Sequence, residues 1–100
     1  MQVRHLSKTI IVSNTAERLT TDENLFARGQ GSLQAAVGNA ARLYVGGAGV
    51  TSSGLNYGVS LDPIDSVPLP FGEGDHFGTQ LNSIYVYGTA GDVVTLLYGR

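Results

Sequence analysis

The sequence predicts an all-β fold: a single antiparallel β-sandwich or jelly roll spanning residues 1–100, with about eight short strands and a C-terminal hairpin. Short apolar runs recur about every ten residues, and several alternate with a period of two. The 14 glycines and three prolines interrupt these runs repeatedly. No segment has the length and period of an ordinary helix. A chain of 100 residues is long enough for one core but not for two.

The first third of the chain contains four strand candidates. They cover residues 3–12, 17–20, 25–28 and 33–37. The first candidate ends in three β-branched residues, which favour strands. Two helical alternatives exist: Thr20 stands three residues before Glu23 as in a capping box, and the Ala and Gln of residues 33–37 favour helix. Gly31 and Gly38 leave too little room for a helix between them, so we predict a strand.

A glycine-rich loop separates two further strands, at residues 41–45 and 55–61. The loop has glycine at four positions, and we interpret it as a connection because glycine reaches positive φ without steric cost. Residues 55–61 alternate apolar and polar, as a half-buried strand does. Residues 62–75 contain all three prolines and are expected to form an edge strand or a loop laid over the sheet.

The C-terminal quarter carries the clearest strand pattern. Residues 81–87 and 92–98 are both rich in apolar residues, and the four residues from Gly88 to Gly91 join them. Two such runs around a short glycine-bounded connection predict a β-hairpin.

Composition excludes several classes of function. Six Lys and Arg residues, none of them in a basic run, make nucleic acid an improbable direct partner. The absence of cysteine excludes disulfides, thiolate catalysis and Cys-ligated zinc. No run approaches the roughly 20 apolar residues of a membrane helix, and no secretory leader pattern is present, so we expect no membrane partner and synthesis in the cytoplasm.

Acidic residues and histidine offer two weak candidate sites. Glu73, Asp75 and His76 could supply metal ligands, but their spacing matches no zinc or EF-hand pattern. Asp62 and Asp65 could act as a carboxylate pair, yet beside a proline they are better explained as turn residues that bond the backbone. We therefore predict no catalytic residues, no metal and no cofactor.

The tyrosines offer one binding hypothesis. Tyr85 and Tyr87 should share one face of a strand, where they could stack against a sugar or a base. Strand aromatics are more often part of a core or of cross-strand pairs, so structural packing is the competing interpretation.

Nearly the whole chain resembles a group of small virion proteins of tailed bacteriophages. The resemblance rests on TIIVSNTAERLT, on RLYVGGAGVTSSGLNYGVSLDPIDSVPLPFG and on LNSIYVYGTAGDVVTLLYGR. It implies a non-enzymatic structural protein. The expectation that follows is a capsid decoration (cement) protein on the virion capsid surface, made in the host cytoplasm, which forms a homotrimer and binds the major capsid protein to stabilise the head.

Two apolar segments are the candidate contacts with such a partner. They comprise Ile10, Ile11, Val12, Val67, Pro68, Leu69, Pro70 and Phe71. The alternative function is a tail- or fibre-associated module that binds a host surface glycan through Tyr85 and Tyr87. A cupin-like enzyme is less favoured, because cupin metal sites use clustered histidines and this chain has two.

Overall fold

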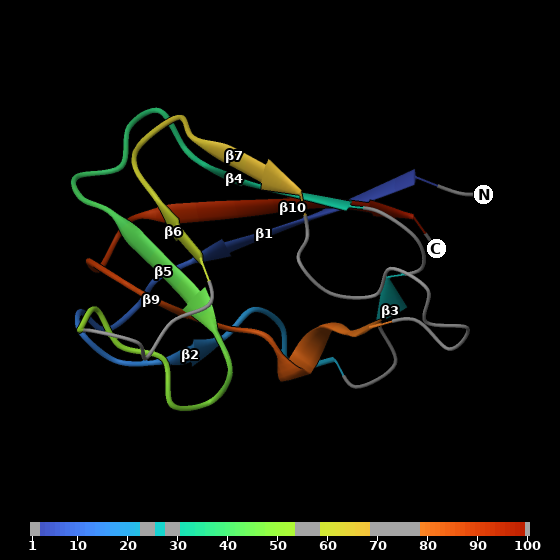
Figure 1. Ribbon diagram of the computed structural model, residues 1–100, viewed down its shortest axis with the longest axis horizontal. Coiled ribbons are helices and arrows are strands. Elements are labelled where there is room, and N and C mark those ends of the chain that lie inside the picture. Colours follow the sequence, from blue (N-terminus) through green and yellow to red (C-terminus); the bar gives the residue numbers. More distant parts are fainter. Residues whose placement is uncertain (1–2, 23–25, 28–30, 54–58, 69–78, 100) are drawn as a thin grey trace.

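The chain folds as a β-sandwich of two antiparallel four-stranded sheets (Figure 1). The computed structural model describes residues 3–22, 26–27, 31–53, 59–68 and 79–99, with the backbone alone at 26–27 and 79–80. Within these ranges there is no α-helix; a 3-10 turn, η1, covers Leu81–Ser83. The predicted fold class is confirmed.

The two sheets are built from eight strands. The first sheet has the order β1 (Val3–Thr9), β10 (Val93–Gly99), β4 (Gly31–Ala35) and β7 (Ser66–Pro68). The second has the order β2 (Glu17–Arg18), β9 (Tyr85–Tyr87), β5 (Leu43–Gly46) and β6 (Val59–Leu61). A separate short pair joins β3 (Phe26–Ala27) to β8 (Thr79–Gln80).

The strand pairing follows a nested pattern. Counted along the eight strands of the two sheets, the first pairs with the eighth, the second with the seventh, the third with the sixth and the fourth with the fifth. This is the pairing of one long antiparallel hairpin rolled up into two sheets, which is the jelly-roll arrangement. As a result, β1 and β7 are the edges of the first sheet, and β2 and β6 are the edges of the second.

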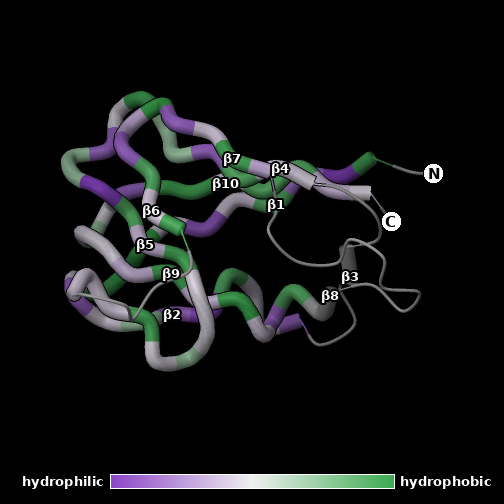
Figure 2. The backbone as a smooth tube through the Cα atoms, in the orientation of Figure 1, coloured by the Kyte–Doolittle hydropathy of each residue, from purple (hydrophilic) through white to green (hydrophobic). Residues whose placement is uncertain are grey.

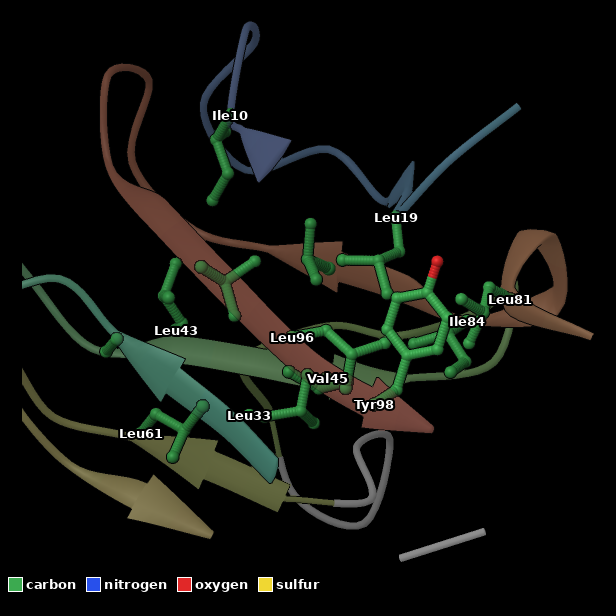
Figure 3. Packing of buried hydrophobic residues seen from close by; sticks show 13 residues of the cluster. Ile10, Leu19, Leu33, Leu43, Val45, Leu61, Leu81, Ile84, Leu96 and Tyr98 are labelled. Carbon is green, nitrogen blue, oxygen red and sulfur yellow. The ribbon is translucent and has the colours of Figure 1, made fainter. Parts of the chain in front are cut away.

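One hydrophobic cluster fills the space between the two sheets (Figure 3). Alternate residues of the long strand β10 face inward, so Val94, Leu96 and Tyr98 are buried while Leu97 between them is exposed. Leu43, Val45, Leu61 and Val86 meet them from the second sheet. The period-two pattern thus places one side of β10 in the core, where each large aliphatic side chain contributes roughly 1.5–3 kcal/mol.

The predicted C-terminal hairpin is wrong. The two strands β9 and β10 belong to different sheets, so the connection between them crosses from one layer to the other. Gly88 lies where the crossing passes over the core, and a Cβ atom built there would come within 2.9 Å of side-chain atoms of both Ile10 and Leu43. Gly91, with φ +92, then reverses the chain. Both strands alternate, but alternation does not reveal whether consecutive strands share a sheet.

Other boundaries also differ from the prediction. The first strand ends at Thr9, and residues 81–83 form the 3-10 turn in place of a strand. The segment predicted at 33–37 is a strand but runs from Gly31 to Ala35, and the proline segment contributes the edge strand β7 as expected. Parts of the strands predicted at 25–28 and 55–61, and the 73–76 acidic segment, lie outside the described residues.

Candidate binding surfaces

Four connections meet at one end of the sandwich. Because neighbouring strands are antiparallel, the ends of β1 and β4 lie beside the starts of β10 and β7. The connections β1–β2, β4–β5, β6–β7 and β9–β10 therefore gather at the left of Figure 1, opposite the two labelled termini. We call this region the loop end and define it as residues 10–16, 36–41, 63–65 and 88–92.

The loop end carries most of the large aliphatic side chains that are strongly exposed in the described residues. Ile11 is 73% exposed, Val12 54%, Val37 81% and Ile64 61%. They come from three connections, and Figure 2 shows apolar segments on the β4–β5 and β6–β7 connections at the top left. Neighbouring strands lie about 4.8 Å apart, so the ends of β1, β4 and β7 from which these connections leave span roughly 14 Å of the first sheet. Solvent-exposed aliphatic residues brought together in this way indicate a contact surface.

Glu17 holds the β1–β2 connection in place. Its carboxylate accepts hydrogen bonds from the backbone N–H groups of Ile11 (3.0 Å) and Val12 (2.8 Å) and pairs with the Lys8 ammonium at 2.9 Å. Burial raises the pKa of Glu17, but the Val12 N–H, Lys8 and the Ile11 N–H together outweigh it, so the pKa lies below its ordinary value. The carboxylate thus fixes the backbone from which two exposed aliphatic side chains project.

Two polar side chains, those of Asp92 and Asn39, hold the β4–β5 connection. Asp92 is 4% exposed and accepts the backbone N–H groups of Ala40 (2.8 Å) and Ala41 (3.1 Å). The Asn39 side chain exchanges two hydrogen bonds with the backbone of Val93, at 2.8 and 2.9 Å, as a neighbouring strand would. Each of these bonds satisfies a backbone group that would otherwise need water. The connection that presents Val37 is therefore fixed to the start of β10.

Ile64 occupies the tip of a tight turn with an unfavourable backbone conformation. The Asp65 N–H donates to the Asp62 carbonyl at 2.9 Å, and Asp65 Oδ2 accepts the Asp62 N–H at 3.0 Å. These bonds confirm that the two aspartates act as turn residues. With Pro63 before it and a φ of 66°, Ile64 takes the position that a type II turn normally gives to glycine.

A second surface is the outer side of the β2–β9–β5–β6 sheet. Tyr44, Tyr85 and Tyr87 project from its two central strands, and Tyr44 is the direct cross-strand partner of Tyr87. These two rings meet edge to face, with centroids 6.2 Å apart and planes at 72°. The Arg18 guanidinium lies 5.3 Å from the Tyr85 ring centroid and also donates to the Asn82 carbonyl. We call this surface, together with Arg42, Ser60 and Asp62, the tyrosine face.

An exposed ion pair between Arg42 and Asp62 forms one part of the tyrosine face. Arg42 Nε lies 2.8 Å from Asp62 Oδ1, and Arg42 Nη2 lies 3.3 Å from Asp62 Oδ2, so the contact is bidentate. The hydrogen bond from Arg42 outweighs the effect of desolvation and holds the pKa of Asp62 below its usual range, while the same bond raises the pKa of Arg42. The two side chains are about half exposed. Their polar atoms remain accessible to a ligand.

The outer side of the first sheet has the opposite character. Along its described strands, no outward position is occupied by Asp, Glu, Lys or Arg. Two rows cross it from β1 to β7: His5, Leu97, Ser32 and Pro68, then Ser7, Thr95, Gln34 and Ser66. The charged residues of β1, Arg4 and Lys8, lie on the other side of the strand with Leu6, which packs on the core. Charge depletion of this kind is typical of interface cores.

The structure separates the residues predicted as partner contacts. Ile10 is 1% exposed and belongs to the core, so it is not available on this surface, whereas its neighbours Ile11 and Val12 are. Val67 packs against the core from inside, and Pro68 projects outward on the uncharged sheet. Leu69, Pro70 and Phe71 lie outside the described residues.

Tyr85 and Tyr87 do lie on one face, as their spacing predicted, but sequence reasoning missed the rest of that surface. Tyr44 joins them through the β5–β9 register, and Arg42 with Asp62 through the β5–β6 register. Their alternation along β5 and β6 placed them on a common side, but the pairing of the strands was not predictable. Tyr98, another of the five tyrosines, is buried in the core.

These surfaces are the features of the described residues on which we base a function. No group of three or more metal-ligating side chains occurs within the described ranges. No helix in that part of the chain is both long and apolar enough to cross a membrane. Comparison with protein-family models, curated proteins and solved structures finds no match. The resemblance to phage virion proteins therefore stays a prediction.

Proposed function

We propose that this chain is a non-enzymatic structural protein of a bacteriophage particle: a capsid decoration protein that docks its loop end on the major capsid protein and stabilises the head. The observation that carries the proposal is the gathering of Ile11, Val12, Val37 and Ile64 at one end of the sandwich. The sequence resemblance supplies the identity of the partner. The jelly-roll arrangement, which also occurs in viral capsid domains, adds support by analogy.

The way the loop end is built suits a docking surface. Glu17 and Asp92 fix the backbone beneath the exposed side chains, so little conformational freedom is lost when a partner binds. Ile64 retains an aliphatic side chain at a position where glycine or asparagine would be less strained. Strain that is kept at an exposed site is a reason to infer a function there.

The uncharged outer side of the first sheet is the proposed surface for self-association into a homotrimer. Half of the outward side chains in its two rows are serine or threonine, which allows a second sheet to approach to the usual separation of about 10 Å. The partner-contact candidate Pro68 lies on this sheet. Its position there favours contact between copies over contact with the capsid.

A binding assay with particles of the phage that encodes the chain tests the docking surface. Val37→Asp should weaken co-sedimentation of the protein with undecorated heads by about tenfold or more, because a buried unpaired charge costs several kcal/mol. The matched control is Thr21→Asp: Thr21 is also exposed but follows β2, at the opposite end of that strand from the loop end. Equal binding of the two variants would overturn the proposed surface.

A further inference from the structure

We propose that the tyrosine face is a binding site for a neutral carbohydrate chain. This inference goes beyond the proposed function, because the face is the outer side of the second sheet and shares no strand with the uncharged sheet. It is carried by Tyr44, Tyr85 and Tyr87, together with the ion pair of Arg42 and Asp62.

The tyrosines form an aromatic platform on regular strands. All three side chains are half-buried, and Tyr87 meets Tyr44 edge to face at 6.2 Å. Arg18 fixes the third ring, Tyr85, by lying 5.3 Å from its centroid. Rings held by cross-strand packing lose little freedom on binding, and an aromatic ring can stack on the apolar C–H face of a pyranose.

The ion pair supplies the polar contacts that a sugar requires. Arg42 directly precedes β5 and stands two residues before Tyr44, a spacing that corresponds to about 7 Å of extended chain. Its bidentate contact with Asp62 holds both groups in a defined geometry. A carboxylate has acceptor sites left after such a pairing, and a guanidinium has donors left. Adjacent hydroxyl groups of a pyranose need such a combination of donor and acceptor.

The charge of this face favours a neutral sugar over other ligands. Asp62 balances Arg42, so Arg18 beside Tyr85 is the excess positive charge on the described face, which is too little for a phosphate backbone or a chain of acidic sugars. Charged residues are depleted from the centres of protein interfaces, but here they border the aromatic rings. The outer side of the first sheet lacks such charges along its described strands and therefore fits a protein interface better than the tyrosine face does.

Nuclear magnetic resonance of the intact chain tests the site. Amide spectra should be recorded with maltotetraose, cellotetraose and chitotetraose, each up to about 10 mM, because weak sugar sites bind near 1 mM. We expect at least one of these sugars to shift resonances of β5, β6 and β9. No shift from any of the three, or shifts confined to the first sheet, would overturn the proposal.

Variants separate stacking from general effects on the fold. Tyr87→Leu should weaken binding of the active sugar by about tenfold, whereas Tyr87→Phe, which keeps the ring, should bind within about threefold of the parent. Thr95→Ala on the uncharged sheet is the matched control and should bind as the parent does. Unchanged binding by Tyr87→Leu would contradict the site. Hyaluronan tetrasaccharide serves as the acidic comparison, and tighter binding of it would contradict the preference for neutral chains.

The sugar-binding measurements are independent of the assay for attachment to heads. Loss of sugar binding in Tyr87→Leu with normal attachment to heads would separate this site from the loop end. Sugar binding by a protein that does not attach to heads would support the tyrosine face and contradict the proposed function.

Discussion

Ile64 combines an exposed aliphatic side chain with a backbone conformation that β-branched residues rarely adopt. Its φ is 66° and its side chain is 61% exposed. A left-handed conformation costs an L-residue roughly 1–2 kcal/mol, and nothing in the core needs this side chain. Stability alone would select a different residue at this position.

Ile64→Asn should therefore raise the free energy of unfolding by about 1 kcal/mol, because asparagine tolerates positive φ, while weakening attachment to heads. Chemical denaturation measures the first effect. Val37→Asn is the control: Val37 is more exposed than Ile64 and has no positive φ, so the stability of the protein should change by less than about 0.5 kcal/mol. A less stable Ile64→Asn variant would show that the turn is not strained.

Glu17 links the acid stability of the fold to the β1–β2 connection. Its pKa lies below the ordinary value of 4.5, so its contribution to stability is present above that pH and is lost as the pH falls through the lowered value. Glu17→Gln should cost roughly 1–2 kcal/mol near pH 7, from weakened charge-assisted hydrogen bonds. The difference from the parent should shrink as the pH falls below 4.5, as followed by denaturation at several pH values.

Asp62 provides the comparison for this effect. Its pKa is also lowered, by Arg42, but the pair is about half exposed. Salt at about 1 M should therefore remove the effect of Asp62→Asn on stability and leave most of the effect of Glu17→Gln. Equal sensitivity of the two variants to salt would mean that Glu17 acts as an ordinary surface charge.

At the scale of elements, the β9–β10 connection decides how the two sheets are joined. It crosses between the layers at Gly88, where a Cβ atom would press on Ile10 and Leu43. Gly88→Ala should destabilise the fold by roughly 1–3 kcal/mol through overpacking, measured by thermal or chemical unfolding. At Gly47 a Cβ atom would meet nothing within 4 Å, so Gly47→Ala should be neutral or slightly stabilising. Similar losses in the two variants would show that the crossing is not tightly packed.

Strand alternation explains why the sequence predicted the elements but not their partners. Residues 92–98 alternate in the structure, with Leu96 and Tyr98 buried and Leu97 exposed, but the sequence alone does not say which side of the strand faces the core. Two apolar runs around a short glycine-bounded connection predict a hairpin between residues 81–87 and 92–98. The hairpin does not form, because such a local pattern carries no information about which sheet a strand joins. The run from Ile10 to Val12 has a similar limit: three β-branched residues in a row do not show which one faces the core.

At the scale of the whole molecule, the candidate surfaces arise from the topology. The exposed residues of the loop end are up to 53 positions apart in the sequence, from Ile11 to Ile64, and only the nested pairing brings their connections together. Tyr85 and Tyr87 could be grouped from their spacing, whereas Tyr44 needed the strand register. Contacts between distant segments were therefore the part that sequence reasoning could not supply.

Cryo-electron microscopy of the intact virion that encodes this chain tests the central claim most directly. The account predicts density for the chain at three-fold or quasi-three-fold positions of the capsid lattice. The loop end should face the major capsid protein, and the uncharged sheets should meet between copies. Density only at the tail or on fibres would contradict the decoration role and favour a receptor-binding module.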